Sequence, residues 1–277
     1  MSKTDTPLVS VIVPTFNSAE FLDACLQSSR AQTYKNIEVI LVDNHSTDDT
    51  QRIAKEYADK VYTKGPERSA QVNYGVNKAK GQYVYKVDSD FTLDPAVIAE
   101  CVQKAAQGYE AVVVHNSPNA AISWVAKVRK FEVDMYKYDL MHSSARFVRK
   151  DIYQAIGGFS ESITAGEDYD FQNKLNRGNY RTGFIKTEAL HHGEPKHLWP
   201  HLKKMYTYGK DSANYQKQNP QEFNGQMNYI LLVWLHNWKR FVRHPLKALQ
   251  LLIYDFLKFS FAGVGLLRSK YANGDKG

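Results

Sequence analysis

The sequence predicts an α/β protein with a mostly parallel central sheet flanked by helices and a helical C-terminal region rich in aromatic and basic residues. Two observations support this prediction. Short apolar runs alternate with helical patterns through the first half of the chain, which is typical of βαβ units. From Trp199 onward the alternation ends and helical patterns take over. We therefore expect one domain over residues 1–195 and a separate C-terminal region over 196–277.

Four short strands are expected in the first third of the chain, at residues 8–13, 37–42, 60–63 and 83–87. The first two are almost entirely apolar, as strands buried on both faces of a parallel sheet are. Helices are expected between these strands, after Ser18, after residues 43–50 and over 69–80. A further strand at 111–115 and a helical stretch around 122–140 follow.

Composition and cysteine content limit the class of protein. The 277 residues are 43% hydrophobic and 23% charged, which is typical of a globular protein. Cys25 and Cys101 are far apart and form no CxxC pair, so neither a disulfide framework nor a zinc site is indicated. The N-terminus has no pattern of a secretion signal. We expect a reducing, cytoplasmic setting.

The positive charge of the chain is concentrated in its last third. Residues 196–277 contain 13 Lys and Arg against 4 Asp and Glu, whereas the preceding residues contain 23 against 25. This asymmetry predicts that the C-terminal region meets a polyanion or an anionic lipid surface. Its cations are interleaved with apolar runs, which suits lipid better than nucleic acid.

Three carboxylates follow the expected strands. Asp43 ends the second strand, and Asp88 and Asp90 follow the fourth. Ligands bind at the carboxyl ends of parallel strands, although a single Asp there is more often a turn former or a helix cap. Residues i and i+2 of an extended segment point the same way, and two carboxylates side by side call for a cation. The pair predicts a Mg²⁺ or Mn²⁺ site that takes up phosphate oxygens of a substrate.

Five motifs in order resemble those of the family 2 glycosyltransferases, which are inverting enzymes with the GT-A fold. They are VSVIVPTFN at 9–17, EVILVDNHSTDDT at 38–50, GPERSAQVNYGVNKAKGQYVYKVDSD at 65–90, GGF at 157–159 and AGEDYD at 165–170. The resemblance covers roughly residues 8–195. It implies that this domain binds a nucleotide sugar and carries out catalysis.

The resemblance implies a set of nucleotide-binding residues. Asp43 would hydrogen-bond the base, Arg68 would neutralise or position the donor, and Asn73 would stiffen or contact the pocket. Asp43 has an alternative role as a helix cap with Asn44 and Ser46, and Arg68 as a solvated charge at a helix start. The pocket would also be lined by Pro14, Thr15 and Asn17.

The metal ligands follow from the same resemblance. Asp88-Ser89-Asp90 resembles the DxD motif, which implies that Asp88 and Ser89 lie near the donor. Asp88 and Asp90 would both belong to the metal site, with Asp88 near the ribose and Asp90 the more direct ligand. A histidine at the end of a later strand, TEALHH, would complete the metal shell or touch the diphosphate. Alternation allows only one of His191 and His192 to point inward, and His191 matches the family position. The alternative is a structural histidine.

Glu167 and Asp168 are the proposed catalytic carboxylates. The resemblance implies that Asp168 is the general base that removes a proton from the acceptor hydroxyl, with Glu167 as an orienting group. The alternative is that both form the acidic first turn of a helix, where the helix dipole stabilises them.

The expected reaction is the transfer of one sugar from a UDP-sugar, with GDP-mannose as the main competitor, to a lipid-linked or glycan acceptor. No QxxRW-type motif of processive synthases follows Asp168, which argues against polymer formation. Two alternatives remain: an inactive nucleotide-sugar-binding or scaffold protein, and a sugar nucleotidyltransferase. The second lacks its glycine-rich phosphate loop at PTFNSAEF.

Residues 226–267 combine interfacial aromatic residues with cations and suggest peripheral contact with the cytoplasmic face of a membrane. Pro245 interrupts the helical pattern. The segment 246–267 is long enough to span a bilayer, but Lys247, Asp255 and Lys258 interrupt it, which favours interfacial helices. The alternative is a helical pair that covers the catalytic domain or forms an oligomer interface.

Overall fold

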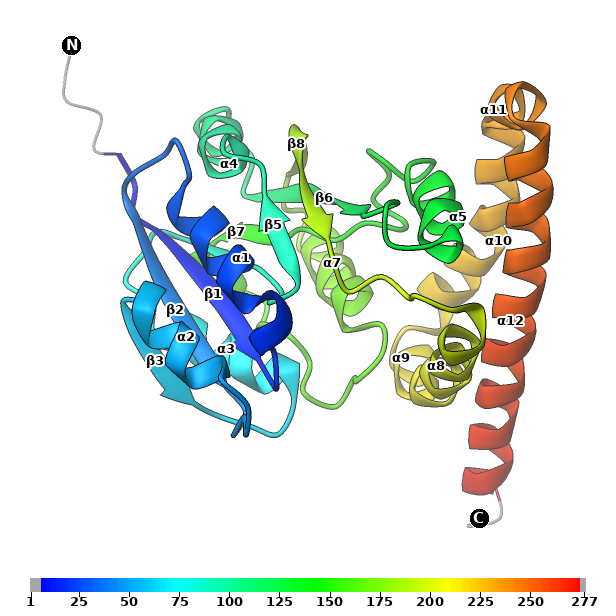
Figure 1. Cartoon of the computed structure of the whole chain (residues 1–277), viewed down its shortest axis with the longest axis horizontal. Helices are drawn as coiled ribbons and strands as arrows, with labels where there is room; N and C mark the ends of the chain where they lie inside the picture. The colour runs from blue at the N-terminus through cyan, green and yellow to red at the C-terminus, as the bar shows by residue number, and fades with distance from the viewer. Residues whose placement is uncertain (1–5, 275–277) are drawn as a thin grey trace. The chain divides into compact units, whose positions relative to one another are not determined.

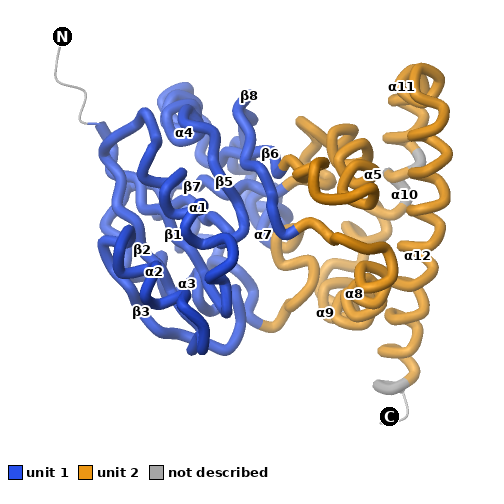
Figure 2. The backbone as a smooth tube through the Cα atoms, viewed as in Figure 1, with its two compact units in different colours: residues 1–116, 144–161, 171–193 blue, residues 117–143, 162–170, 194–277 orange. Residues whose placement is uncertain are grey.

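The computed structural model describes the backbone of residues 6–274 and their side chains except those of residues 228, 229, 231 and 272–274. The chain forms two compact units (Figure 2). The first consists of residues 1–116, 144–161 and 171–193, and the second of residues 117–143, 162–170 and 194–277. The units therefore interleave along the sequence, and the division into domains at residue 195 stays a prediction.

The first unit is built on an eight-stranded sheet with the order β3-β2-β1-β4-β7-β6-β8-β5. Strands β3, β2, β1 and β4 run parallel, while β7 is antiparallel to β4 and β6, and β5 is antiparallel to β8. The predicted α/β fold is confirmed. The strands are β1 (Val9–Thr15), β2 (Ile37–Asp43), β3 (Lys60–Thr63), β4 (Tyr83–Lys86), β5 (Phe91–Leu93), β6 (Ala111–Pro118), β7 (Phe147–Arg149) and β8 (Thr182–His191).

Helices cover both faces of this sheet because its central strands are apolar on both sides. Val11 of β1 packs with Leu22 and Ile98 in the main core. The next residue, Ile12, faces the other side, where a Cβ on Gly75 would lie 2.6 Å from its Cγ2 atom, so a helix approaches the sheet closely there. The helices are α1 (Ala19–Arg30), α2 (Thr50–Tyr57), α3 (Arg68–Lys78), α4 (Val97–Ala106) and α6 (Lys150–Ala155) (Figure 1).

The second unit is helical, as expected of the C-terminal region. Its apolar core includes Phe131, Val233, Leu251 and Tyr254. The helices are α5 (Trp124–Val133), α8 (Leu198–Asp211), α9 (Ala213–Gln218), α10 (Pro220–His236), α11 (Trp238–Arg243) and α12 (Pro245–Gly274), and α7 (Glu167–Arg177) begins in this unit and continues in the first. In the described part of the chain, only Pro245–Tyr271 is long and apolar enough to cross a membrane by length and composition.

Candidate active site

The loops that follow β1 and β2 meet at the carboxyl edge of the sheet. Thr15 and Asp43 are register partners, and the Thr15 hydroxyl donates a hydrogen bond to Asp43 Oδ1 (3.1 Å). Asp43 Oδ2 accepts from the backbone N–H of Ser46 (2.9 Å) and from the Gln51 amide (2.8 Å). The carboxylate is fully buried. These contacts close the turn after β2, whereas the N-cap residue of the next helix is Asp49. A bond from Asp43 to a nucleotide base stays a prediction.

Asn17 joins the same two loops from the other side. Its φ of 46° is in the left-handed region, which Asn tolerates better than most residues. Its backbone N–H donates to the Ser46 hydroxyl (2.8 Å), and its side-chain oxygen accepts from the backbone N–H of Thr47 (2.9 Å). Pro14 is buried within β1 next to this loop. The loops are therefore fixed to each other at the rim where a nucleotide is predicted.

Asp88 is surrounded by three cations. Arg146 Nη1 lies 2.7 Å from Asp88 Oδ2, while Arg68 Nη1 and Lys86 Nζ lie 3.7 and 3.8 Å from Oδ1. Burial disfavours the charged carboxylate, but the charges of Lys86, Arg146 and Arg68 outweigh it and hold the pKa of Asp88 well below its ordinary value. Asp88 is therefore ionised at neutral pH. The neighbouring Ser89 hydroxyl donates to Ser18 (2.9 Å).

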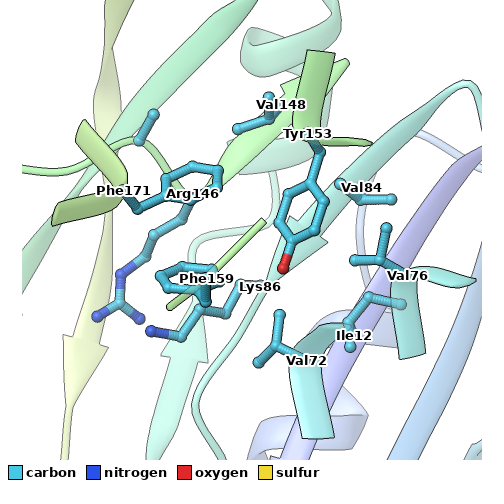
Figure 3. A pocket seen from close by; sticks show the side chains of 11 residues that line it. Ile12, Val72, Val76, Val84, Lys86, Arg146, Val148, Tyr153, Phe159 and Phe171 are labelled. Carbon is cyan, nitrogen blue, oxygen red and sulfur yellow. The ribbon is translucent and has the colours of Figure 1, made fainter. Parts of the chain in front are cut away.

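Lys86 and Arg146 were not predicted as site residues. Both line a small, mostly apolar pocket (Figure 3). Aromatic rings hold them there: Lys86 Nζ is 4.9 Å from the centroid of Phe159, and the Arg146 guanidinium is 5.1 Å from that of Phe91. The sequence signal available for Lys86 was a lysine within the otherwise apolar and aromatic run YVYKV of an expected strand. The segment ARFVRK offered no comparable signal for Arg146.

Asp90 and His191 lie side by side although 101 residues separate them. Antiparallel pairing of β5 with β8 places Phe91 opposite His191, whose ring stacks on Phe91 (4.6 Å between centroids). His191 Nε2 lies 3.0 Å from Asp90 Oδ2. The adjacent His192 is turned toward the Thr92 hydroxyl (2.9 Å), as strand alternation requires. Of the two histidine side chains, that of His191 contacts the Asp90 carboxylate, whereas His192 bonds to the Asp90 carbonyl through its backbone N–H.

The donor atoms of this pair fit a divalent cation. A partly exposed carboxylate suits Mn²⁺ or Mg²⁺, and the neutral imidazole is a common metal ligand. Gly193 makes room for the pair, because a Cβ at that position would lie 2.1 Å from Asp90 Oδ2. No cluster of three or more His, Cys, Asp or Glu ligands occurs among the described residues. Asp90 and His191 would therefore need donor oxygens from outside the chain.

Asn73 stiffens the wall of the site. Its side-chain oxygen accepts from the Tyr153 hydroxyl (2.7 Å) and from the backbone N–H of Phe159 (3.0 Å). Its amide group donates to the Phe159 carbonyl (2.9 Å) and to Glu161 (3.0 Å). Gly158 has φ of 63°, and a Cβ there would lie 2.6 Å from the Asn73 oxygen. Of the two expected roles, these contacts match the stiffening one.

Glu167 and Asp168 belong to the second unit, where they begin α7. Gly166, with φ of 92°, precedes them, and a Cβ on it would meet the Tyr215 ring at 2.8 Å. Glu167 is buried. Burial, together with the charge of Asp168, raises the pKa of Tyr169 to about 12. The helix start is compatible with the dipole role, and the role of Asp168 as base stays a prediction.

Similar proteins of known sequence include glycosyltransferases. An uncharacterized glycosyltransferase of Rickettsia typhi is 29% identical over 191 residues, which are 63% of this chain and 60% of that protein. The GalNAc(5)-diNAcBac-PP-undecaprenol beta-1,3-glucosyltransferase of Campylobacter jejuni is 33% identical over 113 residues, 37% of this chain and 36% of that protein. The chain thus spans about three fifths of the first relative and less of the second.

A solved structure supports the fold. The mannosyltransferase PcManGT from Pyrobaculum calidifontis, in complex with GDP-Man and Mn²⁺, superimposes with a TM-score of 0.66 at 16% identity, covering 97% of this chain and 88% of that one. The model of the family Glycosyl transferase family 2 matches residues 10–162, more than half of the chain. The chain therefore belongs to glycosyl transferase family 2 and has a GT-A-like fold.

Proposed function

We propose that this glycosyltransferase moves a single sugar from a nucleotide diphosphate sugar to a hydroxyl group of a lipid-linked or glycan acceptor, with inversion at the anomeric carbon. One observation carries the proposal: Asp90 Oδ2 and His191 Nε2 lie 3.0 Å apart at the carboxyl edge of the sheet. The ionised Asp88 belongs to the same edge. Such an edge is where α/β sheets bind nucleotides.

The donor would be held from two sides. Asp90 and His191 would bind Mn²⁺ or Mg²⁺, and the cation would neutralise the diphosphate as it leaves. Thr15, Asn17 and the Asp43 loop would form the nucleoside end. Arg68, whose side chain is about half exposed next to Asp88, is available to contact a donor phosphate. The GDP-Man and Mn²⁺ of the Pyrobaculum structure support this ligand class, and a UDP-sugar remains the default donor.

Asp168 would act as the base. The acceptor hydroxyl would lose its proton to the Asp168 carboxylate while its oxygen forms a bond to the anomeric carbon. The bond from that carbon to the diphosphate would break with both electrons going to the leaving nucleoside diphosphate. Glu167 would orient Asp168 or the acceptor. The absence of a processive-type motif after Asp168 supports one transfer per acceptor.

The acceptor is proposed from composition and from one relative. The Campylobacter relative carries undecaprenol in its name, and the tail of this chain is basic and aromatic. Both support an acceptor presented at a membrane. Cys25 and Cys101 are buried and free, as suits the reducing cytoplasmic side that we propose for the reaction.

Product formation tests this proposal. The full chain is incubated with Mn²⁺, a panel of UDP- and GDP-sugars and a short-chain polyprenyl-phosphate or glycan acceptor, and the products are identified by mass spectrometry and NMR. We expect one donor to give a single added sugar of inverted anomeric configuration. A retained configuration would contradict the mechanism. Donor binding without transfer to any acceptor would favour the inactive scaffold, and nucleotide-sugar synthesis would favour the nucleotidyltransferase.

A further inference from the structure

The solvent-exposed side of α12 carries a stripe of large apolar side chains that is interrupted at the exposed Ser260. At 100° per residue these side chains fall within an arc of roughly 80°. Each is between 52% and 76% exposed. We call these six residues the apolar face: Leu246, Leu249, Ile253, Phe256, Val264 and Leu267.

The opposite side of α12 is bound to the rest of the second unit along its length. Leu251 and Tyr254 are fully buried in the core of that unit. Toward the C-terminal end, α8 and α12 touch backbone to backbone: a Cβ on Gly209 would lie 1.9 Å from the Ala262 carbonyl oxygen, and one on Gly265 would lie 2.1 Å from that of Tyr206. The helix therefore has one orientation in this unit, with the apolar face outward.

The charges that interrupt the apolar sequence of α12 point inward. Between residues 248 and 267 the charged residues are Asp255 and Lys258. Lys258 Nζ lies 2.5 Å from both Asp255 Oδ1 and Glu132 Oε1 of α5. Asp255 is 1% exposed. The charges therefore do not disrupt the apolar face.

Cations stand at both ends of the apolar face. Lys239 and Arg243 are exposed before it, Lys247 is exposed next to its first residue, and Arg268 and Lys270 are exposed after it. From residue 223 to 274 the sequence has a single acidic residue, the buried Asp255. An uncharged apolar stripe between clusters of cations complements a bilayer surface with anionic headgroups.

We propose that the apolar face lies in the plane of a membrane, inserted at the boundary between headgroups and acyl chains of a leaflet containing anionic lipid. A spanning orientation is disfavoured because α8, which is packed on α12, exposes Lys203, Lys204 and Lys210, and charges at bilayer depth are costly. Docking would bring the enzyme to a lipid-linked acceptor, and this purpose is the one part of the inference that rests on the proposed function.

Vesicle flotation tests the docking. The full chain is mixed with vesicles of phosphatidylglycerol and phosphatidylcholine, or of phosphatidylcholine alone. We expect at least tenfold tighter binding to the anionic vesicles, weakening with salt, and at least a tenfold loss in the double variant Leu249→Asp/Phe256→Asp. Trp124→Asp, which adds a charge at an exposed aromatic residue of the same unit outside the apolar face, should bind within twofold of wild type.

Several outcomes would overturn the proposal. One is a wild-type chain that does not float with anionic vesicles; another is a double variant that folds with an unchanged melting temperature and floats like wild type. If the wild type were a dimer in light scattering and the double variant a monomer, with no vesicle binding by either, a second copy would be the occupant. Transfer to a short soluble acceptor is measured in parallel. Loss of transfer in all forms, with flotation intact, would remove the proposed function and leave the docking.

Measuring the depth of labels in the bilayer distinguishes a helix that lies in the membrane plane from one that spans the bilayer. Leu249→Cys, Phe256→Cys and Val264→Cys are labelled singly with an environment-sensitive fluorophore, which the fully buried Cys25 and Cys101 should not take up. Quenching by lipids brominated at known depths should place all three labels at one shallow depth. A steady change of depth from residue 249 to residue 264 would show a spanning helix and contradict the proposal.

Discussion

The two units place their charged and their large apolar side chains differently. The first unit buries apolar strands and gathers Asp88, Asp90 and Arg68 at the edge of its sheet. The second unit buries the Lys258–Glu132–Asp255 cluster and exposes large apolar residues such as Leu246 and Phe256. Buried charges and exposed apolar stripes both cost free energy in water. This contrast is consistent with our proposals that the first unit binds an anionic ligand and that the second contacts an apolar surface.

The largest effect should come from Asp168→Asn, which tests whether the chemical step depends on a residue of the second unit. Without the base, turnover should fall roughly 10²- to 10⁴-fold, while the affinity for the donor stays within twofold. Steady-state kinetics and donor titration measure the two quantities. Asp211→Asn, on α8 of the same unit, is the control and should leave both unchanged. Turnover near the wild-type value would show that Asp168 is not the base.

Lys258→Met would break the buried cluster that distinguishes the second unit. The variant leaves Glu132 and Asp255 facing each other without their cation, and breaking a buried pair in this way costs about 3–5 kcal/mol. Denaturant unfolding of the variant measures the loss. Lys270→Met removes an exposed cation of the same helix and should change the free energy of unfolding by less than about 0.5 kcal/mol. Equal stability of the two variants would mean that the cluster is not buried in solution.

His201→Gln tests the second unit through the pH dependence of its free energy of unfolding. Burial, aided by the charges of Arg129, Lys258 and Lys204, lowers the pKa of His201 to about 4. Because the folded pKa lies below the unfolded one, the stability that His201 contributes is present above about pH 6.5 and is lost as the pH falls toward 4. We expect wild type to lose on the order of 2 kcal/mol more than His201→Gln over that range. Parallel pH profiles of unfolding for the two proteins would contradict this prediction.

Arg146→Ala should have the smallest effect, and it acts in the first unit. Arg146 touches Asp88, and we propose that it is a positioning residue for the donor site. Lys86 and Arg68 remain near Asp88 in the variant, so we expect about a tenfold weaker donor affinity, or ~1.4 kcal/mol, with turnover at saturating donor nearly unchanged. Arg146→Lys should recover part of the loss. A fall in turnover without a change in donor affinity would contradict the positioning role.

Much of the fold could be predicted because the central strands are continuous apolar runs. The strands expected at 8–13, 37–42, 60–63 and 83–87 agree with β1 to β4 to within two residues at each end. The short strands β5 and β7 were missed because three residues carry no periodicity. They supply the antiparallel part of the sheet, and β5 is the strand that places Asp90 next to His191.

The inward direction of the α12 charges could not be predicted for a different reason. The helix is apolar on nearly all sides, so its sequence does not say which side is buried. Glu132, which binds Lys258, lies 126 residues away and comes from α5. In the sequence, Asp255 and Lys258 therefore look like interruptions of an apolar segment. In the structure they form an ion pair inside the second unit. Contacts with residues distant in the sequence decide which side of such a helix is buried, and the local sequence pattern does not contain this information.

The most direct test of the account is calorimetric binding of UDP and GDP with and without Mn²⁺. It is carried out on wild type, Asp90→Ala and His191→Ala. We predict that one of the two nucleotides binds wild type tightly only in the presence of Mn²⁺, and that both variants lose this metal-dependent binding while keeping the wild-type melting temperature. Equal binding of a nucleotide to wild type and Asp90→Ala, independent of Mn²⁺, would contradict the metal site at Asp90 and His191.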